Sequence, residues 1–214
     1  MIPTKKEMEQ CWDGRFPFKL FEILQSSMVS IAGLGGLGSH IAVMLARSGV
    51  GKLHLVDFDC VEMSNLNRQE YDVRHIGQYK TQALCQRLLE INPYIEIVTD
   101  TLRITAENAS TLFSKSPIVC EAFDMPDQKA MLINTVLEQC PNTVIVSGNG
   151  MAGYGSANTI QTRKFNKRLY ICGDEKTDVQ SGIGLMAPRV SVCAGHQANQ
   201  VIRILLNETE NELC

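Results

Sequence analysis

The chain has 214 residues, a formal net charge of -3 and 44% hydrophobic residues. This length and apolar content fit one domain with a substantial core, and the interspersed charges contain no basic block of the kind that binds nucleic acid. No apolar run approaches the roughly twenty residues of a membrane span, and no signal-peptide pattern follows the first residues. We therefore expect a cytoplasmic protein with neither a nucleic-acid nor a membrane partner.

The eight cysteines raise the question of a metal site. They never form a Cys-x-x-Cys pair, which tetrahedral zinc sites usually need, so we expect no structural zinc. Cys85, Cys120 and Cys193 fall within apolar patterns, where a thiol acts as a small buried hydrophobe. The four histidines lack metal-ligand spacing and are expected to be structural.

Residues 1–27 form an N-terminal segment that we separate from the main domain at 28–214. Apolar residues at helical spacing near its end predict a helix. Phe16, Phe18 and Phe21 would expose a large apolar patch on a monomer, so we expect this segment to support a homodimer.

Strands and helices alternate along the main domain. Apolar and β-branched runs predict strands over 29–32, 53–57, 95–98, 118–124 and 143–147. Helical periodicity predicts helices over 38–49, 80–91, 106–115, from Pro126 onward and over 188–206. Two short runs, 158–162 and 168–172, predict antiparallel strands, and the stretch 173–184 is a candidate crossover loop. The order predicts an α/β, Rossmann-like, doubly wound and mainly parallel sheet that antiparallel strands extend, with ligands at the carboxyl ends of strands.

The turn Gly33-Leu34-Gly35-Gly36-Leu37-Gly38 follows the first strand and opens a helix. In this context a Gly-x-Gly-x-x-Gly pattern brings backbone N–H groups close to phosphates, although glycines also serve tight turns and helix packing. Asp57 ends the next strand, where a carboxylate can accept hydrogen bonds from ribose hydroxyls or can cap a helix. These features fit NAD and ATP equally well.

Three charged residues distinguish the two nucleotides. Arg68 lies on the polar loop after the second strand, Lys80 opens the next helix, and Asp124 ends the fourth strand. Singly, such cations are more often solvated surface charges, but together at this edge they can neutralise a triphosphate. Asp124 can bind magnesium beside phosphates, or it can cap the helix that begins near Pro126. We therefore expect ATP and Mg²⁺ as the ligands.

These residues together resemble the ubiquitin-activating-enzyme-like superfamily of adenylyltransferases, and within it the ThiF and MoeB type. The resemblance covers residues 28–206 and includes Ser64-Asn65-Leu66-Asn67-Arg68-Gln69 and Gly184-Leu185-Met186-Ala187-Pro188. It implies an ATP site formed by Gly33, Gly35, Gly36, Gly38, Asp57, Asp59, Asn65, Arg68, Gln69 and Lys80. It also implies that Arg68, Lys80 and Asp124 are catalytic, and that Asp124 holds magnesium.

The same resemblance implies a reaction. The C-terminal Gly-Gly carboxylate of a small ubiquitin-like sulfur-carrier protein attacks the α-phosphate of ATP, which gives a carrier acyl-adenylate and pyrophosphate. No side-chain nucleophile is needed for this step. The chain looks like a compact member of the thiamine-biosynthesis type. Its relatives imply a homodimer, and a separate sulfur-donor protein is compatible with them as a further partner.

The chain departs from the family pattern at two places. The two zinc-binding Cys-x-x-Cys pairs of many relatives are absent, and Gln180 stands where some relatives carry a cysteine that becomes linked to the carrier. A covalent relay is therefore not expected, and Cys172 is the nearest alternative thiol. Arg15 is a candidate counterpart of an arginine that relatives contribute across their dimer.

Three other functions remain open. An NAD-linked oxidoreductase shares the glycine turn and Asp57, but it usually adds a second substrate-binding region with a catalytic acid or base. A non-catalytic carrier-binding module has no need of Arg68, Lys80 and Asp124. A relative that activates a modified adenosine in tRNA is disfavoured by the absence of a basic surface.

The first prediction separates the two nucleotides. ATP with Mg²⁺ should bind and NAD should not, because Arg68, Lys80 and Asp124 meet at the mouth of one glycine turn. Titration calorimetry with each nucleotide measures this, and binding of NAD without binding of ATP would contradict it.

Overall fold

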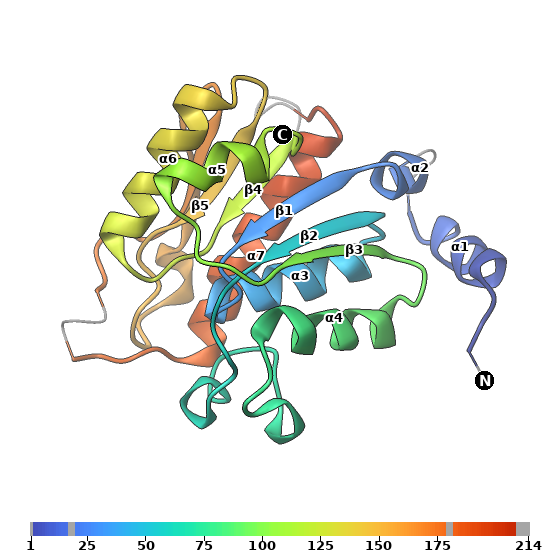
Figure 1. The fold of residues 1–214 in the computed structure, drawn as a ribbon, viewed down its shortest axis with the longest axis horizontal. Coiled ribbons are helices and arrows are strands. Elements are labelled where there is room, and N and C mark those ends of the chain that lie inside the picture. The colour runs from blue at the N-terminus through green and yellow to red at the C-terminus, as the bar shows by residue number, and fades with distance from the viewer. Residues whose placement is uncertain (1, 17–19, 179–181, 209–214) are drawn as a thin grey trace.

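The computed structural model describes residues 2–16, 20–178 and 182–208. A seven-stranded sheet in the order β3-β2-β1-β4-β5-β7-β6 forms its centre (Figure 1). The strands are β1 (Met28–Ala32), β2 (Lys52–Val56), β3 (Glu96–Asp100), β4 (Ile118–Glu121), β5 (Val144–Gly148), β6 (Gln161–Asn166) and β7 (Leu169–Gly173). The winding direction reverses between β1 and β4, which lie side by side. Doubly wound sheets bind ligands in the crevice at such a reversal.

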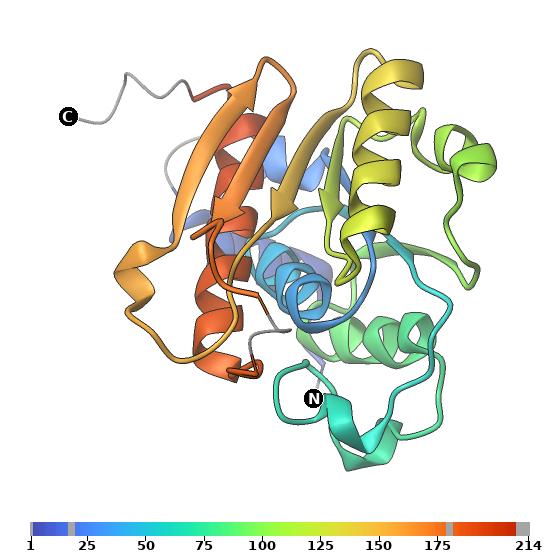
Figure 2. The same ribbon diagram turned by 90° about the vertical axis from the view of Figure 1, so that its left-hand side faces the viewer.

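Helices cover both faces of the sheet (Figures 1 and 2). One face carries α3 (Gly36–Arg47), α4 (Lys80–Ile91) and α7 (Ala187–Leu205), and the other carries α5 (Ala106–Phe113) and α6 (Pro126–Gln139). A separate apolar core lies under each group, with Ile41 and Leu84 in the first and Phe113 and Leu132 in the second. Among the helices that the structure describes, none combines the length and the apolar character needed to cross a bilayer.

The predicted fold class is confirmed, with a correction to the last two strands. β1 to β5 are parallel, and β7 also pairs with β5 in parallel, so among the described strands β6 alone runs antiparallel. Two residues connect β6 to β7, and such a hairpin fixes the two strands antiparallel. The predicted strand at 158–162 was placed too early, because Ala157–Thr159 forms a short 3-10 helix before β6 begins at Gln161.

The N-terminal segment contains α1 (Lys5–Asp13) and α2 (Leu20–Gln25). Phe21 of α2 is only 6% exposed, and its ring stacks on that of Phe16 at a centroid distance of 5.9 Å. The expectation of an exposed apolar patch is therefore wrong for Phe21, whose ring is covered by its own chain. Phe18, the third member of that patch, lies outside the described residues.

Gly38 serves the packing of α3 against the end of β1. A Cβ added at Gly38 would lie 1.9 Å from the backbone oxygen of Gly33 and 3.2 Å from the side chain of Ile31. The backbone of α3 can approach the turn this closely only because Gly38 has no side chain.

Gly38→Ala should lower the free energy of unfolding by about 1–3 kcal/mol, the usual range for overpacking, because the backbone at Gly33 has to shift. Gly195→Ala in α7 is the matched control, since a Cβ there meets nothing within 4 Å and alanine favours a helix. Urea denaturation of both variants measures the difference. A Gly38→Ala variant as stable as the parent chain would refute the packing argument.

Candidate nucleotide-binding site

A cleft of about 670 Å³ opens at the carboxyl ends of β1, β2, β4 and β5. Ten of the predicted site residues line it: Gly33, Gly35, Gly36, Asp57, Asp59, Asn65, Arg68, Gln69, Lys80 and Asp124. Gly38 is the exception, since it lies in the packed contact between α3 and β1. The residues come from the three segments that follow β1, β2 and β4, and they converge because parallel strands end at the same edge of a sheet.

The glycine turn between β1 and α3 has a conformation that side chains would not allow. Gly33 has a φ of +89°, and a Cβ there would lie 2.9 Å from the ring of Phe123 and 3.1 Å from the backbone oxygen of Ala122. Gly35 is the N-cap of α3, and no side chain caps the first turn of this helix. Its N–H groups and the positive end of its dipole are thus available to an anion.

Asp57 follows β2 and ties the glycine turn to the next loop. One carboxylate oxygen accepts the N–H of Leu34 at 2.6 Å, and the other accepts the N–H of Asp59 at 2.8 Å. Burial raises the pKa of the Asp57 carboxyl, and the nearby ammonium of Lys80 acts in the opposite direction. The side chain is 8% exposed, so Asp57 is held rigidly where it lines the cleft.

Lys80, the first residue of α4, is not a solvated surface charge. The residue is 6% exposed, and its Nζ lies 2.9 Å from Oδ2 of Asp59. A buried ammonium is costly without a partner, so the Asp59 carboxylate both stabilises the charge and fixes its position in the cleft.

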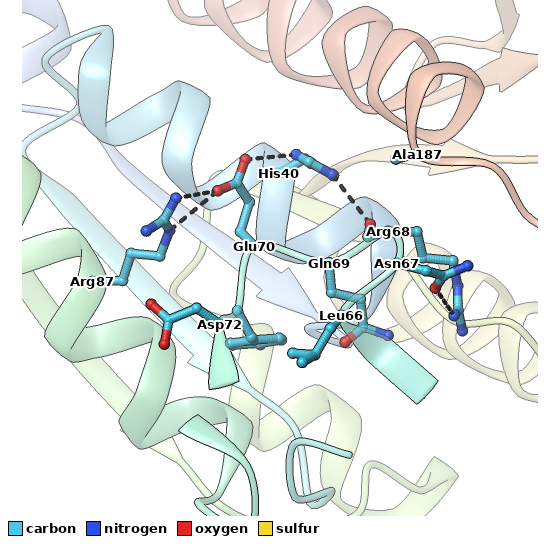
Figure 3. Close-up of a pocket in the computed structure, with 10 residues that line it drawn as sticks. His40, Leu66, Asn67, Arg68, Gln69, Glu70, Asp72, Arg87 and Ala187 are labelled. Atoms are coloured by element: carbon cyan, nitrogen blue, oxygen red, sulfur yellow. Dashed lines mark hydrogen bonds and ion pairs between the residues drawn. The ribbon is translucent and has the colours of Figure 1, made fainter. Parts of the chain in front are cut away.

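The loop between β2 and α4 carries three further predicted residues. Arg68 donates from Nη1 to the backbone oxygen of Ser64 at 3.0 Å. It also donates from Nη1 to Oδ1 of Asn67 at 2.8 Å (Figure 3). Asn65 and Gln69 are each 9% exposed. Among the described residues nothing hydrogen-bonds to Oε1 of Gln69, and such a buried acceptor needs a donor that a ligand could supply.

Asp124 lies between β4 and α6, and the structure excludes its capping alternative. Met125 is the N-cap of α6, and no side chain caps this helix. Asp124 is exposed at the cleft, and its carboxylate forms no hydrogen bond or ion pair within the described part of the chain. It is therefore free to bind a cation together with an anionic ligand.

A buried polar cluster beneath Asp124 was missed by the sequence analysis. Glu121, which is 0% exposed, accepts from Nζ of Lys129 at 2.7 and 2.9 Å and from Oγ of Ser147 at 2.5 Å. It also accepts the N–H of Phe123 at 2.7 Å, which fixes the turn before Asp124. Lys129 also lines the cleft and adds a positive charge to those of Arg68 and Lys80. The sequence carries one sign of this cluster, which is that the acidic residue Glu121 stands in an otherwise apolar strand. A buried carboxylate requires a buried partner.

A second missed pair anchors the cleft wall formed by residues 175–178. Arg189 and Asp174 form a salt bridge in which both residues are buried. Burial acts to raise the pKa of Asp174, but the N–H groups of Thr177 and Lys176 and the Arg189 guanidinium outweigh it and lower the pKa. The predicted cysteine-equivalent position Gln180 lies outside the described residues.

The cysteines differ sharply in access to the cleft. Cys172 on β7 is 0% exposed and does not line the cleft, and burial raises the pKa of its thiol to about 11. Cys60 is exposed and lines the cleft.

Arg15, the candidate counterpart of an arginine contributed across a dimer, is exposed and does not line the cleft of its own chain.

The pattern of the ThiF family matches residues 14–214. The chain belongs to the ThiF family. It is 31% identical over 199 residues to the molybdopterin-synthase adenylyltransferase of Salmonella typhimurium, a match that covers 89% of this chain and 77% of that protein. It is 29% identical over 191 residues to the adenylyltransferase and sulfurtransferase UBA4 of Scheffersomyces stipitis, covering 85% of this chain and 42% of that protein.

Solved structures agree on the fold of this ThiF-family chain. The E. coli tRNA N6-threonylcarbamoyladenosine dehydratase TcdA, in its complex with ATP, superposes with a TM-score of 0.85 over 100% of both chains at 19% identity. The predicted family and fold class are thus confirmed. The prediction of an enzyme is confirmed as well, because the two relatives above are named adenylyltransferases and each matches most of this chain. The chain spans less than half of UBA4, which is the longer protein.

Proposed function

We propose that this ThiF-family protein is an adenylyltransferase that uses ATP to activate the C-terminal Gly-Gly carboxylate of a small ubiquitin-like sulfur-carrier protein. The observation that carries the proposal is the convergence of the glycine turn, Arg68, Lys80 and Asp124 on one cleft. The relatives named as molybdopterin-synthase adenylyltransferase and as UBA4 support the same reaction class.

In this proposal the triphosphate lies at the N-terminus of α3, and Asp57 accepts hydrogen bonds from the ribose. A carboxylate oxygen of the carrier attacks the α-phosphorus, the bond from that phosphorus to the bridging oxygen breaks, and pyrophosphate leaves with the electron pair. Arg68 and Lys80 neutralise the charge that develops on the phosphates. No side chain forms a covalent bond, so the protein acts through positioning and charge neutralisation.

Asp124 fits the magnesium that the proposal includes. Magnesium in nucleotide sites is usually held by one or two carboxylates plus phosphate oxygens and waters, not by a complete protein cage. The described residues contain no cluster of three or more candidate metal ligands, whereas Asp124 presents one unpaired carboxylate at the cleft. When bound, the ion supplies positive charge to the phosphate oxygens, and Asp124 holds it at the end of β4.

The finer parts of the proposal concern pathway and assembly. We assign the carrier to thiamine biosynthesis, the next step to a separate sulfur-donor protein, and the working form to a cytoplasmic homodimer to which Arg15 contributes. The sequence resemblance and the absence of Cys-x-x-Cys pairs motivate these assignments. ATP–pyrophosphate exchange with a panel of purified carriers tests the pathway assignment, and exchange restricted to a molybdopterin-type carrier would reassign the pathway.

Asp124→Asn should reduce carrier-dependent pyrophosphate exchange by about 100-fold or more while it leaves the free energy of unfolding unchanged within about 0.5 kcal/mol. The carboxylate has no hydrogen-bond or ion-pair partner among the residues that the structure describes, so its loss acts on the metal and phosphates. Asp127→Asn is the matched control, because Asp127 is exposed in the first turn of α6 and does not line the cleft. Unchanged exchange by Asp124→Asn at saturating Mg²⁺ would overturn the metal assignment.

Cys172→Ser should keep both adenylation and thiocarboxylate formation. Burial and a raised pKa keep the Cys172 thiol out of the cleft and protonated, so it is a poor nucleophile. Pyrophosphate exchange measures the first activity, and mass spectrometry of the carrier measures the second. Loss of sulfur transfer with normal exchange would instead establish a Cys172 relay, provided that urea denaturation shows an intact fold.

A further inference from the structure

The carboxylate of Glu121 is buried next to the cleft but cannot contact a ligand in it. Glu121 is the last residue of β4, is 0% exposed and does not line the cleft. Any effect of this carboxylate on the site therefore has to pass through the groups that it holds.

Glu121 closes a ring of chain that contains the Asp124 turn (residues 122–125). Its Oε1 accepts the N–H of Phe123 at 2.7 Å. The ammonium of Lys129, eight residues further along the chain, lies 2.9 Å from Oε1 and 2.7 Å from Oε2. The N–H of Lys129 donates to the backbone oxygen of Met125 at 3.0 Å, within the first turn of α6. The ion pair thus fastens the first turn of α6 to the end of β4, with the Asp124 turn between them.

Two neighbouring elements hold Glu121 itself in place. Ser147 stands opposite Glu121 in the register of β4 and β5, and its Oγ donates to Oε2 of Glu121 at 2.5 Å. Gln197 of α7 donates from Nε2 to the backbone oxygens of Glu121 and Val146, at 3.1 and 3.0 Å. The side chain and the main chain of Glu121 are both fixed, so its carboxylate is a rigid anchor for the Asp124 turn.

Stability alone does not account for the ion pair between Glu121 and Lys129. Apolar residues of similar volume often replace a buried ion pair without loss of stability, because charges are costly to bury. The best-attested use of such a pair is to select one arrangement among several. Here the pair selects the position of the Asp124 turn. The Asp124 carboxylate has no hydrogen-bond or ion-pair partner within the described ranges, so its position depends on the backbone that carries it.

We propose that Glu121 and Lys129 are positioning residues for the metal ion, because their ion pair places the Asp124 carboxylate where it meets a cation bound to the nucleotide phosphates. The inference rests on the proposed function, since it requires Asp124 to hold that cation. Arg68 and Lys80 bond to other partners, and the pair carries no net charge. Loss of the pair should therefore weaken the contribution of the metal and leave the binding of nucleotide alone unchanged.

The test is titration calorimetry of the full chain with α,β-methylene-ATP, once with saturating Mg²⁺ and once with EDTA. The parent chain should bind the analogue more tightly with Mg²⁺. A variant that combines Glu121→Gln with Lys129→Met should lose affinity in Mg²⁺ by about tenfold or more, as is typical when a group that orients a metal ligand is removed. Its affinity in EDTA should equal that of the parent. Both residues are changed together because a single change would leave one charge buried and unpaired.

A matched control makes the same two changes in a different ion pair. Lys52 and Glu96 pair between the first residues of β2 and β3, at the opposite end of these strands from the cleft. Lys52→Met combined with Glu96→Gln should bind the analogue as the parent does under both conditions. Circular dichroism of every variant reports whether the fold is intact.

A double-mutant cycle shows whether the pair acts through Asp124. In an Asp124→Asn background, neutralising the pair should cause no further loss in Mg²⁺, because the carboxylate that it positions is already gone. If the doubly neutral variant does not fold, Ser147→Ala takes its place, since it removes one donor to Glu121 and keeps the ion pair. It should show a smaller loss of the same kind.

The outcomes separate the positioning role from the proposed function. Losses that add in the cycle, or parent-like affinity of the substituted chain in Mg²⁺, would overturn the positioning role while nucleotide binding by the parent stands. A parent affinity that does not depend on Mg²⁺ would overturn the positioning role together with the metal assignment of Asp124. A parent chain that binds the analogue under neither condition would refute the proposed function itself.

Discussion

The close approach of the glycine turn to the end of β4 is the constraint on which the rest of the site depends. Gly33 takes a left-handed conformation with Phe123 and the carbonyl of Ala122 within 3.2 Å of any added Cβ. Only this approach brings the uncapped N-terminus of α3 to the edge where Asp124 follows β4. Asp57 then holds the turn from the other side through the N–H of Leu34. The turn thus sets the positions of an anion-binding helix end, a ribose-binding candidate and a metal-binding candidate together.

The charges of the cleft follow a second rule, which is that a buried or half-buried lysine ammonium lies beside a carboxylate. Asp59 pairs with Lys80, and Glu121 pairs with Lys129, so both ammonium groups are fixed before any ligand arrives. Preorganised charges stabilise a developing phosphate charge better than mobile ones, because no reorganisation is needed during the reaction. Asp124 breaks the rule, because its carboxylate is unpaired within the described ranges of the chain, and an ion from solution is the partner that its position favours.

The sequence was enough to predict the fold class, the edge of the sheet at which the cleft opens and ten of the residues that line the cleft. The fold class and this edge were predicted from strand periodicity and from the glycine turn, which act over short stretches of chain. Asp59, Asn65 and Gln69 were predicted only from the family resemblance. What was missed depends on contacts between distant segments. Glu121 meets Lys129 and Ser147 across two strands and a helix, and Arg189 meets Asp174 from a different layer. Neither pairing produces a recognisable motif in the sequence. The sequence shows only a single charged residue within an apolar pattern, which indicates that a buried partner exists but not which residue it is.

The sheet itself determines which chemistry the cleft can support. Cys172 pairs with Gly148 on β5 and with Thr162 on β6, so its thiol can reach the cleft only if β7 leaves both neighbours. The Arg189–Asp174 pair stands directly after β7 and bonds to the backbone oxygens of Ala152 and Ser156, which opposes such a movement. Breaking a buried ion pair typically costs about 3–5 kcal/mol, whereas the cations of the cleft act where they already lie. The fold therefore favours reaction through positioned charges over transfer through this thiol.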